Sequence, residues 1–256
     1  MATVTNVLRI GTWNLHEAAP ADAGPSAADA ARQEIIELLI HHQLDIVALQ
    51  EVDFHAPGRS RTLDAIAKST PLRYTASSML SESMFDPACG AGVAIASRFP
   101  LDNVVRRLFE NPDLTGELDG APIRMFDKGY VSAVLGVAGR IVSFISLHSF
   151  PFHLFGRDAE DPAFRHIWSA LSADLATLTP APLIVCGDFN TSRRDLLSRD
   201  RKLRLSRAIT RQPTYQDQTI DDMLFSRHFE LVNVAVVDNF SDHRLCLAEV
   251  AVERAR

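Results

Sequence analysis

Cysteine is scarce in this sequence, and long apolar runs are absent. Three cysteines, Cys89, Cys186 and Cys246, occur among 256 residues. They are too few and too scattered for a disulfide framework or for a metal site built from closely spaced cysteines, and they are typical of a protein in a reducing compartment. No run of 18 apolar residues occurs, and no basic start precedes an apolar segment. We therefore expect a cytoplasmic protein with no signal peptide and no stable membrane insertion.

An excess of basic charge is also missing. The 26 Lys and Arg residues face 32 Asp and Glu residues, for a formal net charge of −6. This balance argues against a protein that wraps duplex DNA by charge alone, although a local basic patch stays possible. The hydrophobic share of 46% excludes wholesale disorder. No linker, repeat or low-complexity block divides the chain, so we expect one domain over residues 1–256.

Short apolar runs that are typical of strands outnumber the helical segments. A strict alternation of strands and helices is absent, which disfavours a doubly wound sheet and favours two packed sheets with helices outside. We expect a loop over 18–29 and helices over 30–42, 62–69 and 163–178. Strands are predicted over 7–15, 45–52, 72–80, 92–98, 104–109, 130–137, 140–147, 183–190, 220–225, 231–237 and 245–252.

Several of these strands end abruptly in polar residues that can do chemistry. A single polar strand ending can be explained by turn formation as readily as by function. Together they mix carboxylates, amides and two histidines, which favours one shared cleft presented by a rigid scaffold. The endings are Trp13-Asn14, Gln50-Glu51, Leu147-His148, the segment 187–190, Ile220-Asp221 and the segment 241–243.

The order of these segments resembles the endonuclease/exonuclease/phosphatase superfamily, the deoxyribonuclease I-like enzymes. The matching motifs span most of the chain: TWNL at 12–15, LQEV at 49–52, GVAIASRFP at 92–100, SLHS at 146–149, GDFNTS at 187–192, PTYQDQTIDDMLFS at 213–226 and SDHRLCL at 241–247. The resemblance implies a four-layer α/β sandwich, in which helices flank two central, mostly antiparallel sheets. It also implies divalent-metal-dependent hydrolysis of a phosphoester by a single catalytic domain.

The resemblance further implies roles for individual residues. Glu51 is similar to the family's main metal carboxylate, with Asn14 beside it and Asp242 near the metal. Asp188 resembles the group that positions or deprotonates the attacking water, and Asn190 the group that holds the phosphate or the nucleophile. His148 and His243 resemble the pair that contacts the scissile phosphate, and Asp221 would orient His243.

The residue types suit that chemistry on physical grounds. Mg²⁺ is a hard cation that prefers oxygen ligands and needs few protein carboxylates, and Mn²⁺ is a possible substitute. A bound metal acts as a Lewis acid on the negative charge that develops at the phosphate oxygens. Histidines near a phosphate are biased toward their charged form, and a carboxylate behind a histidine fixes its orientation.

Two departures from the family pattern concern the site. His16 stands where abasic-site endonucleases usually have an acidic residue, which weakens assignment to that branch. Asp222 replaces an aromatic residue that normally packs after Asp221, so the register of this motif is open.

Residues 193–211 form the most asymmetric stretch of charge in the chain. Eight basic residues face only two aspartates there. A solvated face with its leucines turned inward and an anionic-substrate patch are both open readings. The candidate substrate contacts in this basic segment are Arg193, Arg194, Arg201, Lys202 and Arg204.

Three phenylalanines follow His148 in the sequence, at positions 150, 152 and 155. They suit a stacking platform for bases, a contact for an acyl chain, or plain packing.

We interpret the chain as a Mg²⁺-dependent phosphodiesterase that acts on nucleic acid or nucleotides. The alternative is a phospholipid or sphingomyelin phosphodiesterase that reads a lipid head group, or a phosphatase on the same fold. A non-catalytic binding protein is a third hypothesis. The intact set of polar strand ends argues against it.

Overall fold

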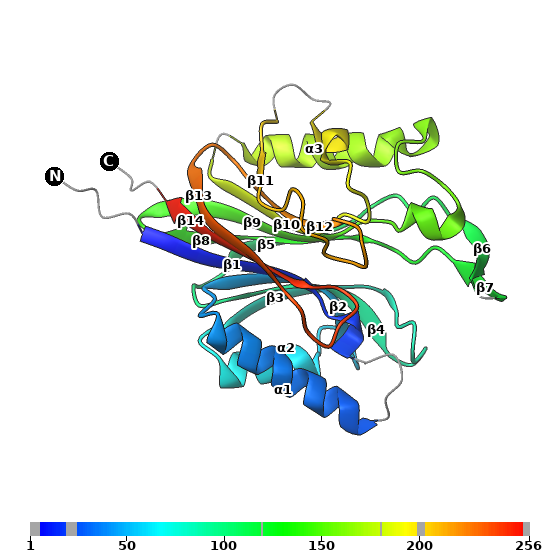
Figure 1. The fold of residues 1–256 in the computed structure, drawn as a ribbon, viewed down its shortest axis with the longest axis horizontal. Coiled ribbons are helices and arrows are strands. Elements are labelled where there is room, and N and C mark those ends of the chain that lie inside the picture. The colour runs from blue at the N-terminus through cyan, green and yellow to red at the C-terminus, as the bar shows by residue number, and fades with distance from the viewer. Residues whose placement is uncertain (1–5, 19–24, 119, 180, 199–202, 253–256) are drawn as a thin grey trace.

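Two six-stranded sheets lie face to face in this computed structural model, which describes residues 6–18, 25–118, 120–179, 181–198 and 203–252. Helices α1 and α2 cover the outer face of one sheet, and α3 covers the outer face of the other (Figure 1). The predicted four-layer α/β sandwich is therefore confirmed.

The first sheet has the strand order β13-β14-β1-β2-β4-β3. All its neighbours are antiparallel except β1 and β2, which run parallel. Its strands are β1 (Asn6–Asn14), β2 (Ile46–Phe54), β3 (Tyr74–Glu82), β4 (Gly90–Ser97), β13 (Phe229–Val237) and β14 (Leu245–Val252).

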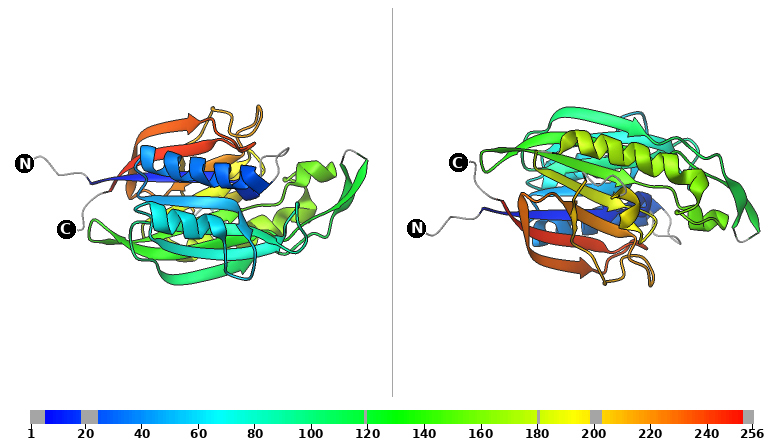
Figure 2. Two further views of the ribbon diagram at one scale, coloured as in Figure 1. Left: turned by 90° about the horizontal axis from the view of Figure 1, so that it is seen from below. Right: turned by 90° about the horizontal axis from the view of Figure 1, so that it is seen from above.

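The second sheet has the strand order β11-β12-β10-β9-β8-β5, and its one parallel pair is β9 and β10. Its strands are β5 (Asp102–Leu108), β8 (Gly129–Val137), β9 (Arg140–His148), β10 (Leu183–Asp188), β11 (Ser206–Arg207) and β12 (Asp221–Phe225). A separate hairpin of β6 (Thr115–Leu118) and β7 (Ala121–Arg124) projects at one end of the molecule (Figure 2).

Each interlayer space holds its own buried cluster. Side chains from both sheets, such as Ile10, Val93 and Phe144, fill the space between the sheets. A second cluster lies under α1 and α2, and a third lies under α3. Burial of this apolar surface is the main force that holds the layers together.

The helices follow the sequence signals closely, with one exception. In α2 (Arg61–Ser69), the Ser60 hydroxyl accepts a hydrogen bond from the Leu63 amide at 3.1 Å, a standard N-cap. In α3 (Arg165–Leu178), Ile167, Leu171 and Leu175 are buried on the predicted stripe. The predicted loop over 18–29 is wrong at its end, because α1 (Pro25–His41) begins at a proline, which is favoured in the first helical turn.

Four short 3₁₀ turns complete the described structure: η1 (His16–Ala18), η2 (Phe152–Phe155), η3 (Pro162–Phe164) and η4 (Arg194–Leu197). In the part of the chain that the structure describes, no helix combines the length and the hydropathy needed to cross a membrane.

Candidate active site

The polar strand ends meet at one edge of the sandwich because of the parallel pairs. Asn14 lies across from Gln50 in the β1–β2 register, and Asp188 lies across from His148 in the β9–β10 register. Asp221 begins β12 opposite Asp188. Carboxyl ends of parallel strands share one edge of a sheet, so the predicted residues come together from both sheets.

Glu51 reaches the cleft through an irregularity in β2. The pairing of β2 with β4 shifts register between Leu49 and Val52, and Glu51 has a left-handed φ of 48°. Such a conformation is strained for a residue other than glycine and is common at functional sites. The preceding Gln50 is buried and donates to the Ser146 hydroxyl at 3.1 Å, which ties the two sheets together directly behind the cleft.

His148 lies between two carboxylates. Its Nε2 atom is 3.3 Å from Asp188 Oδ2 and 3.8 Å from Glu51 Oε1. The Lys128 Nζ atom lies 3.2 and 3.3 Å from the two ring nitrogens of His148. Burial raises the pKa of Glu51, but the nearby charges of His148 and Lys128 outweigh it and lower the pKa overall. Glu51 is therefore a carboxylate anion in the cleft.

His243 makes the closest ion pair of the site. Its Nδ1 atom lies 2.9 Å from Asp221 Oδ2, and its Nε2 atom lies 3.9 Å from Asp188 Oδ2. Burial alone lowers the pKa of His243, but Asp221 and Asp188 raise it to about 10. The Thr214 hydroxyl accepts the Asp221 backbone amide at 3.0 Å and fixes the start of β12. His243 thus has a fixed ring orientation and a positive charge.

Asp188 is the centre of this network. It accepts the Asn190 amide at 2.8 Å and the side-chain amides of Asn14 and Asn190 at 3.2 Å each. Burial raises the pKa of Asp188, but His243 and the donors around it lower the pKa well below its usual range. Asn190, with a φ of 50°, also donates to the Ser149 carbonyl at 3.0 Å. The turn after β10 is therefore bound to the end of β9.

The residues predicted to hold a metal suit a hard cation. Glu51, Asp188 and Asp242 line one cleft and offer carboxylate oxygens, and the buried Asn14 donates to Asp188. Asp242 is exposed, and the neighbouring Ser241 hydroxyl donates to the Asn14 carbonyl at 2.8 Å. Cys186 and Cys246 are buried in the space between the sheets, away from these donors. An oxygen-rich donor set fits Mg²⁺ or Mn²⁺.

A second arrangement of possible ligands is Asp188, Asp221 and His243, whose ligand atoms lie within 4.8 Å of one another. Here the Nδ1 atom of His243 already pairs with Asp221. In the described part of the chain, the Asp221 Oδ1 atom is buried without a hydrogen-bond partner. A buried carboxylate oxygen without a partner costs free energy, so this atom is suited to accept a hydrogen bond from a water or to coordinate a cation at the site.

The cleft that contains these groups has a volume of about 1150 Å³. Glu51, His148, Asp188 and His243 line one part of it, and the β6–β7 hairpin and η2 line another. Its size suits a small molecule or part of a larger chain.

The described residues of the basic segment do not line this cleft. Arg194 is buried, its guanidinium lies 3.2 Å from Asp222 and donates to the Ile220 carbonyl, and it stacks on the Phe189 ring. Arg207 shares the same carboxylate of Asp222 at 2.8 Å. Asp222 therefore replaces the expected aromatic residue with a buried ion pair, and each guanidinium nitrogen of Arg194 already bonds within the protein, to Asp222, Thr191 or Ile220.

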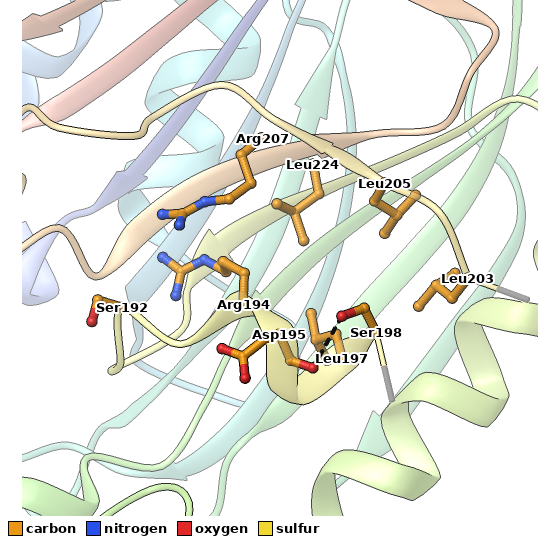
Figure 3. A pocket seen from close by; sticks show the side chains of 9 residues that line it. All are labelled: Ser192, Arg194, Asp195, Leu197, Ser198, Leu203, Leu205, Arg207 and Leu224. Atoms are coloured by element: carbon orange, nitrogen blue, oxygen red, sulfur yellow. Dashed lines mark hydrogen bonds between the residues drawn. The ribbon is translucent and has the colours of Figure 1, made fainter. Parts of the chain in front are cut away.

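The other candidate substrate contacts are spread out. Arg193 forms a two-pronged pair with Asp195 and also contacts Glu160, and Arg204 is exposed. Arg201 and Lys202 lie outside the described residues. Figure 3 shows the guanidinium groups of Arg194 and Arg207 side by side at a separate, leucine-lined pocket of about 340 Å³.

The three phenylalanines after His148 divide between core and cleft. Phe150 and Phe152 are 1% exposed and pack in the cluster under α3. A stacking role for these two rings is therefore wrong. Phe155 is partly buried and lines the cleft.

Two cleft residues were missed from the sequence. Lys128 precedes β8 and contacts His148, and the Tyr215 ring lies 4.6 Å from the His243 ring. Tyr215 belongs to the motif at 213–226 that resembles the family, so the sequence did offer a signal for it. Lys128 stands alone before a hairpin, where nothing in the local pattern distinguishes it from a surface lysine.

Comparisons with known proteins bear on the family and the fold of the chain. The model of the Endonuclease/Exonuclease/phosphatase family matches residues 11–243. A search of curated proteins found no match. A structure of an endonuclease/exonuclease/phosphatase from Beutenbergia cavernae is 18% identical, with a TM-score of 0.72 over 96% of this chain and 72% of that chain.

Two further solved structures share the fold. The human Nocturnin catalytic domain with bound sulfate is 16% identical, with a TM-score of 0.66 over 98% of this chain and 97% of that one. Sphingomyelinase C from Streptomyces griseocarneus is 15% identical, with a TM-score of 0.59 over 96% and 99%. At these identities the likeness concerns the fold alone.

Proposed function

The chain belongs to the endonuclease/exonuclease/phosphatase family, and from this premise we propose that it is a divalent-metal-dependent hydrolase of phosphodiester bonds. The observation that carries the proposal is the pair of histidines, His148 and His243, which both approach the Asp188 carboxylate in one part of the cleft.

The metal is Mg²⁺, with Mn²⁺ as a possible substitute. Glu51 would hold it, with Asn14 and Asp242 beside it. When bound, it supplies Lewis-acid stabilisation of the charge that develops on the phosphate. Glu51 is ionised. The irregularity in β2 turns its carboxylate into the cleft, where it can bind the cation.

Asp188 positions the attacking water. Its low pKa keeps it ionised at neutral pH, and its oxygens already accept hydrogen bonds from Asn14 and Asn190. It therefore orients a water by accepting a hydrogen bond, and it withdraws a proton only as the attack proceeds. Asn190 is held in place by Ser149 and supports the phosphate or the water.

His243 and His148 face the phosphate. Protonated His243 donates from Nε2 to a phosphate oxygen, while Asp221 holds Nδ1 and fixes the ring. Lys128 adds a second positive charge next to His148. Fixed donors in a partly desolvated site stabilise developing negative charge more strongly than water does.

For the substrate, the sequence favours nucleic acid or nucleotides, and a lipid head group is the alternative. The prediction depends on the basic segment, and reversing Arg201, Lys202 and Arg204 to Glu tests it. We expect a higher KM for an oligonucleotide and a weaker dependence on salt, because each lost phosphate contact reduces the salt slope. An unchanged KM and salt slope would remove the basic segment from the substrate site. A cytoplasmic location also remains a prediction from the cysteine content.

The activity itself is tested by one screen. Purified protein with Mg²⁺ or Mn²⁺ is assayed against bis(p-nitrophenyl) phosphate, plasmid, oligonucleotides and phospholipid. We expect hydrolysis that EDTA abolishes and that the His243→Ala variant lowers by about 10²-fold or more. Equal turnover by wild type and His243→Ala would mean that this site does not carry the activity.

A further inference from the structure

Exposed aliphatic side chains gather around the mouth of the active-site cleft. Met84 is 53% exposed, Leu118 is 44% exposed and Leu154 is 37% exposed, and all three line the cleft. Single exposed apolar residues are ordinary, but several around one opening mark a binding surface. They come from three segments far apart in the sequence.

The three segments are fixed in place. Phe155 of η2 packs near Gly116 of the β6–β7 hairpin, where an added Cβ atom would lie 3.4 Å from the phenylalanine ring. The Met125 amide donates to the Leu114 carbonyl at 2.8 Å and closes the base of the hairpin. In the segment after β3, the Met84 amide donates to the buried Glu17 carboxylate at 3.0 Å. The apolar wall is therefore preformed.

Positive charge is sparse among the described residues that line this cleft. Arg124 on the hairpin forms an exposed ion pair with Glu82 at 2.6 Å. Lys128 contacts His148 beside Glu51 and Asp188. Among the described lining residues, these two are the lysine and arginine side chains. A polynucleotide needs several cations for the phosphates that flank the scissile one, and the described residues of this wall offer Arg124 alone, already paired with Glu82.

We propose that the part of the cleft lined by the β6–β7 hairpin and η2, next to the reacting phosphate, binds the flexible aliphatic chain of a phosphodiester substrate. This inference rests on the proposed function, because the same substrate spans both parts. The reacting group lies at His148 and His243, and the chain extends along Met84, Leu118 and Leu154.

An aliphatic chain fits this wall better than a nucleobase. Flexible side chains such as methionine and leucine adapt to a chain of variable shape. A base is recognised by a flat aromatic face and by hydrogen bonds to its edge. The two rings that line this part of the cleft, Phe126 and Phe155, are both partly covered. A nucleoside phosphate is therefore the competing occupant in the test.

The test measures binding without turnover. Methyl-, butyl- and octylphosphonic acid, which carry a carbon–phosphorus bond that the enzyme does not hydrolyse, are titrated calorimetrically into the Mg²⁺-loaded protein. Full burial of a methylene is worth about fourfold in affinity, and about half that free energy in an open cleft gives about twofold. We expect octylphosphonate to bind about 16-fold more tightly than butylphosphonate.

Wall variants link this preference to the cleft. In Leu118→Glu/Leu154→Glu, and independently in Met84→Glu, the ratio between octyl and butyl should fall to about fourfold or less. Ile141→Glu is the matched control, because Ile141 is 63% exposed at the start of β9 and does not line the cleft. It should keep the wild-type ratio, and equal melting temperatures would show that all variants are folded.

The outcomes separate the two proposals. Equal affinity for all three phosphonates, or tighter binding of adenosine monophosphate than of octylphosphonate, overturns the aliphatic-chain inference whether or not the enzyme hydrolyses bis(p-nitrophenyl) phosphate. A chain-length preference with no hydrolysis of any ester overturns the proposed function and leaves the chain site standing. Hydrolysis of phosphatidylcholine in vesicles is compared with hydrolysis of a soluble phosphodiester that carries an aliphatic chain of the same length. The comparison distinguishes a substrate taken from a membrane from one taken from solution.

Discussion

Replacing Asp222 by asparagine should cost this protein much of its stability. The carboxylate of Asp222 is fully buried and lies 3.2 Å from the Arg194 guanidinium and 2.8 Å from that of Arg207. Its other oxygen accepts the Ile209 and Met223 amides at 2.9 and 2.8 Å. Asparagine keeps the shape but leaves the charge of Arg194 buried without its counter-ion.

The magnitude follows from that burial. The Arg194 side chain is 5% exposed, and burial lowers its pKa to about 10 even with Asp222 opposing the shift. Removing one partner of a buried pair typically costs about 3–5 kcal/mol. Since whole domains are stable by about 5–15 kcal/mol, the Asp222→Asn variant should lose about a fifth of its stability or more.

Urea unfolding followed by circular dichroism measures the loss. Arg207→Met is the matched control, because its side chain is 31% exposed and its removal leaves the Arg194 pair intact. It should cost about 1 kcal/mol. Combining Arg194→Met with Asp222→Asn should recover about 2 kcal/mol relative to the sum of the single losses. A loss below 1 kcal/mol in Asp222→Asn, or strict additivity, would refute the buried-pair account.

Three further predictions concern the active site. His243→Ala and Asp221→Asn should each lower kcat/KM, and their losses should not add, since the two side chains act as a unit; full additivity in the double variant would contradict the pairing. Lys128→Met should lower kcat/KM for a small phosphodiester by about tenfold or more with an unchanged melting temperature, and wild-type turnover would exclude a role for Lys128. In EDTA, the stabilisation from the His243 pair should be complete below the unfolded histidine pKa of about 6.5 and should be lost as pH rises through the folded pKa of about 10; urea unfolding of wild type and His243→Gln should therefore converge across that window, and a gap that widens with pH would contradict the prediction.

The sequence could predict the sheets and the edge where polar groups meet, because both follow from short-range patterns. Buried strands read as continuous apolar runs, as in β10, and the predicted stripe of α3 is buried as expected. The parallel pairs then bring Asn14, His148 and Asp188 to one edge.

What escaped prediction depends on partners distant in the chain. Arg194 appears in a run of basic residues, and only the fold shows that Asp222, 28 positions away, neutralises it. Similarly, Lys128 stands out only because the fold brings it into contact with His148, 20 positions away. The β6–β7 hairpin escaped notice because its residues are mostly exposed and lack an alternating pattern. Burial and pairing that the tertiary structure creates cannot be read from composition.

The central claim is that Glu51 holds the metal of a phosphodiesterase site, and Glu51→Gln tests it most directly. Glutamine is nearly isosteric but removes the charged oxygen that lies 3.8 Å from His148. Hydrolysis of bis(p-nitrophenyl) phosphate is measured against Mg²⁺ concentration for both proteins, with melting temperatures as the control for folding. We predict that EDTA abolishes wild-type activity and that Glu51→Gln loses about 100-fold or more in kcat/KM even at saturating Mg²⁺. A variant that reaches wild-type rates at saturating Mg²⁺, or a wild type that EDTA leaves active, would contradict the claim.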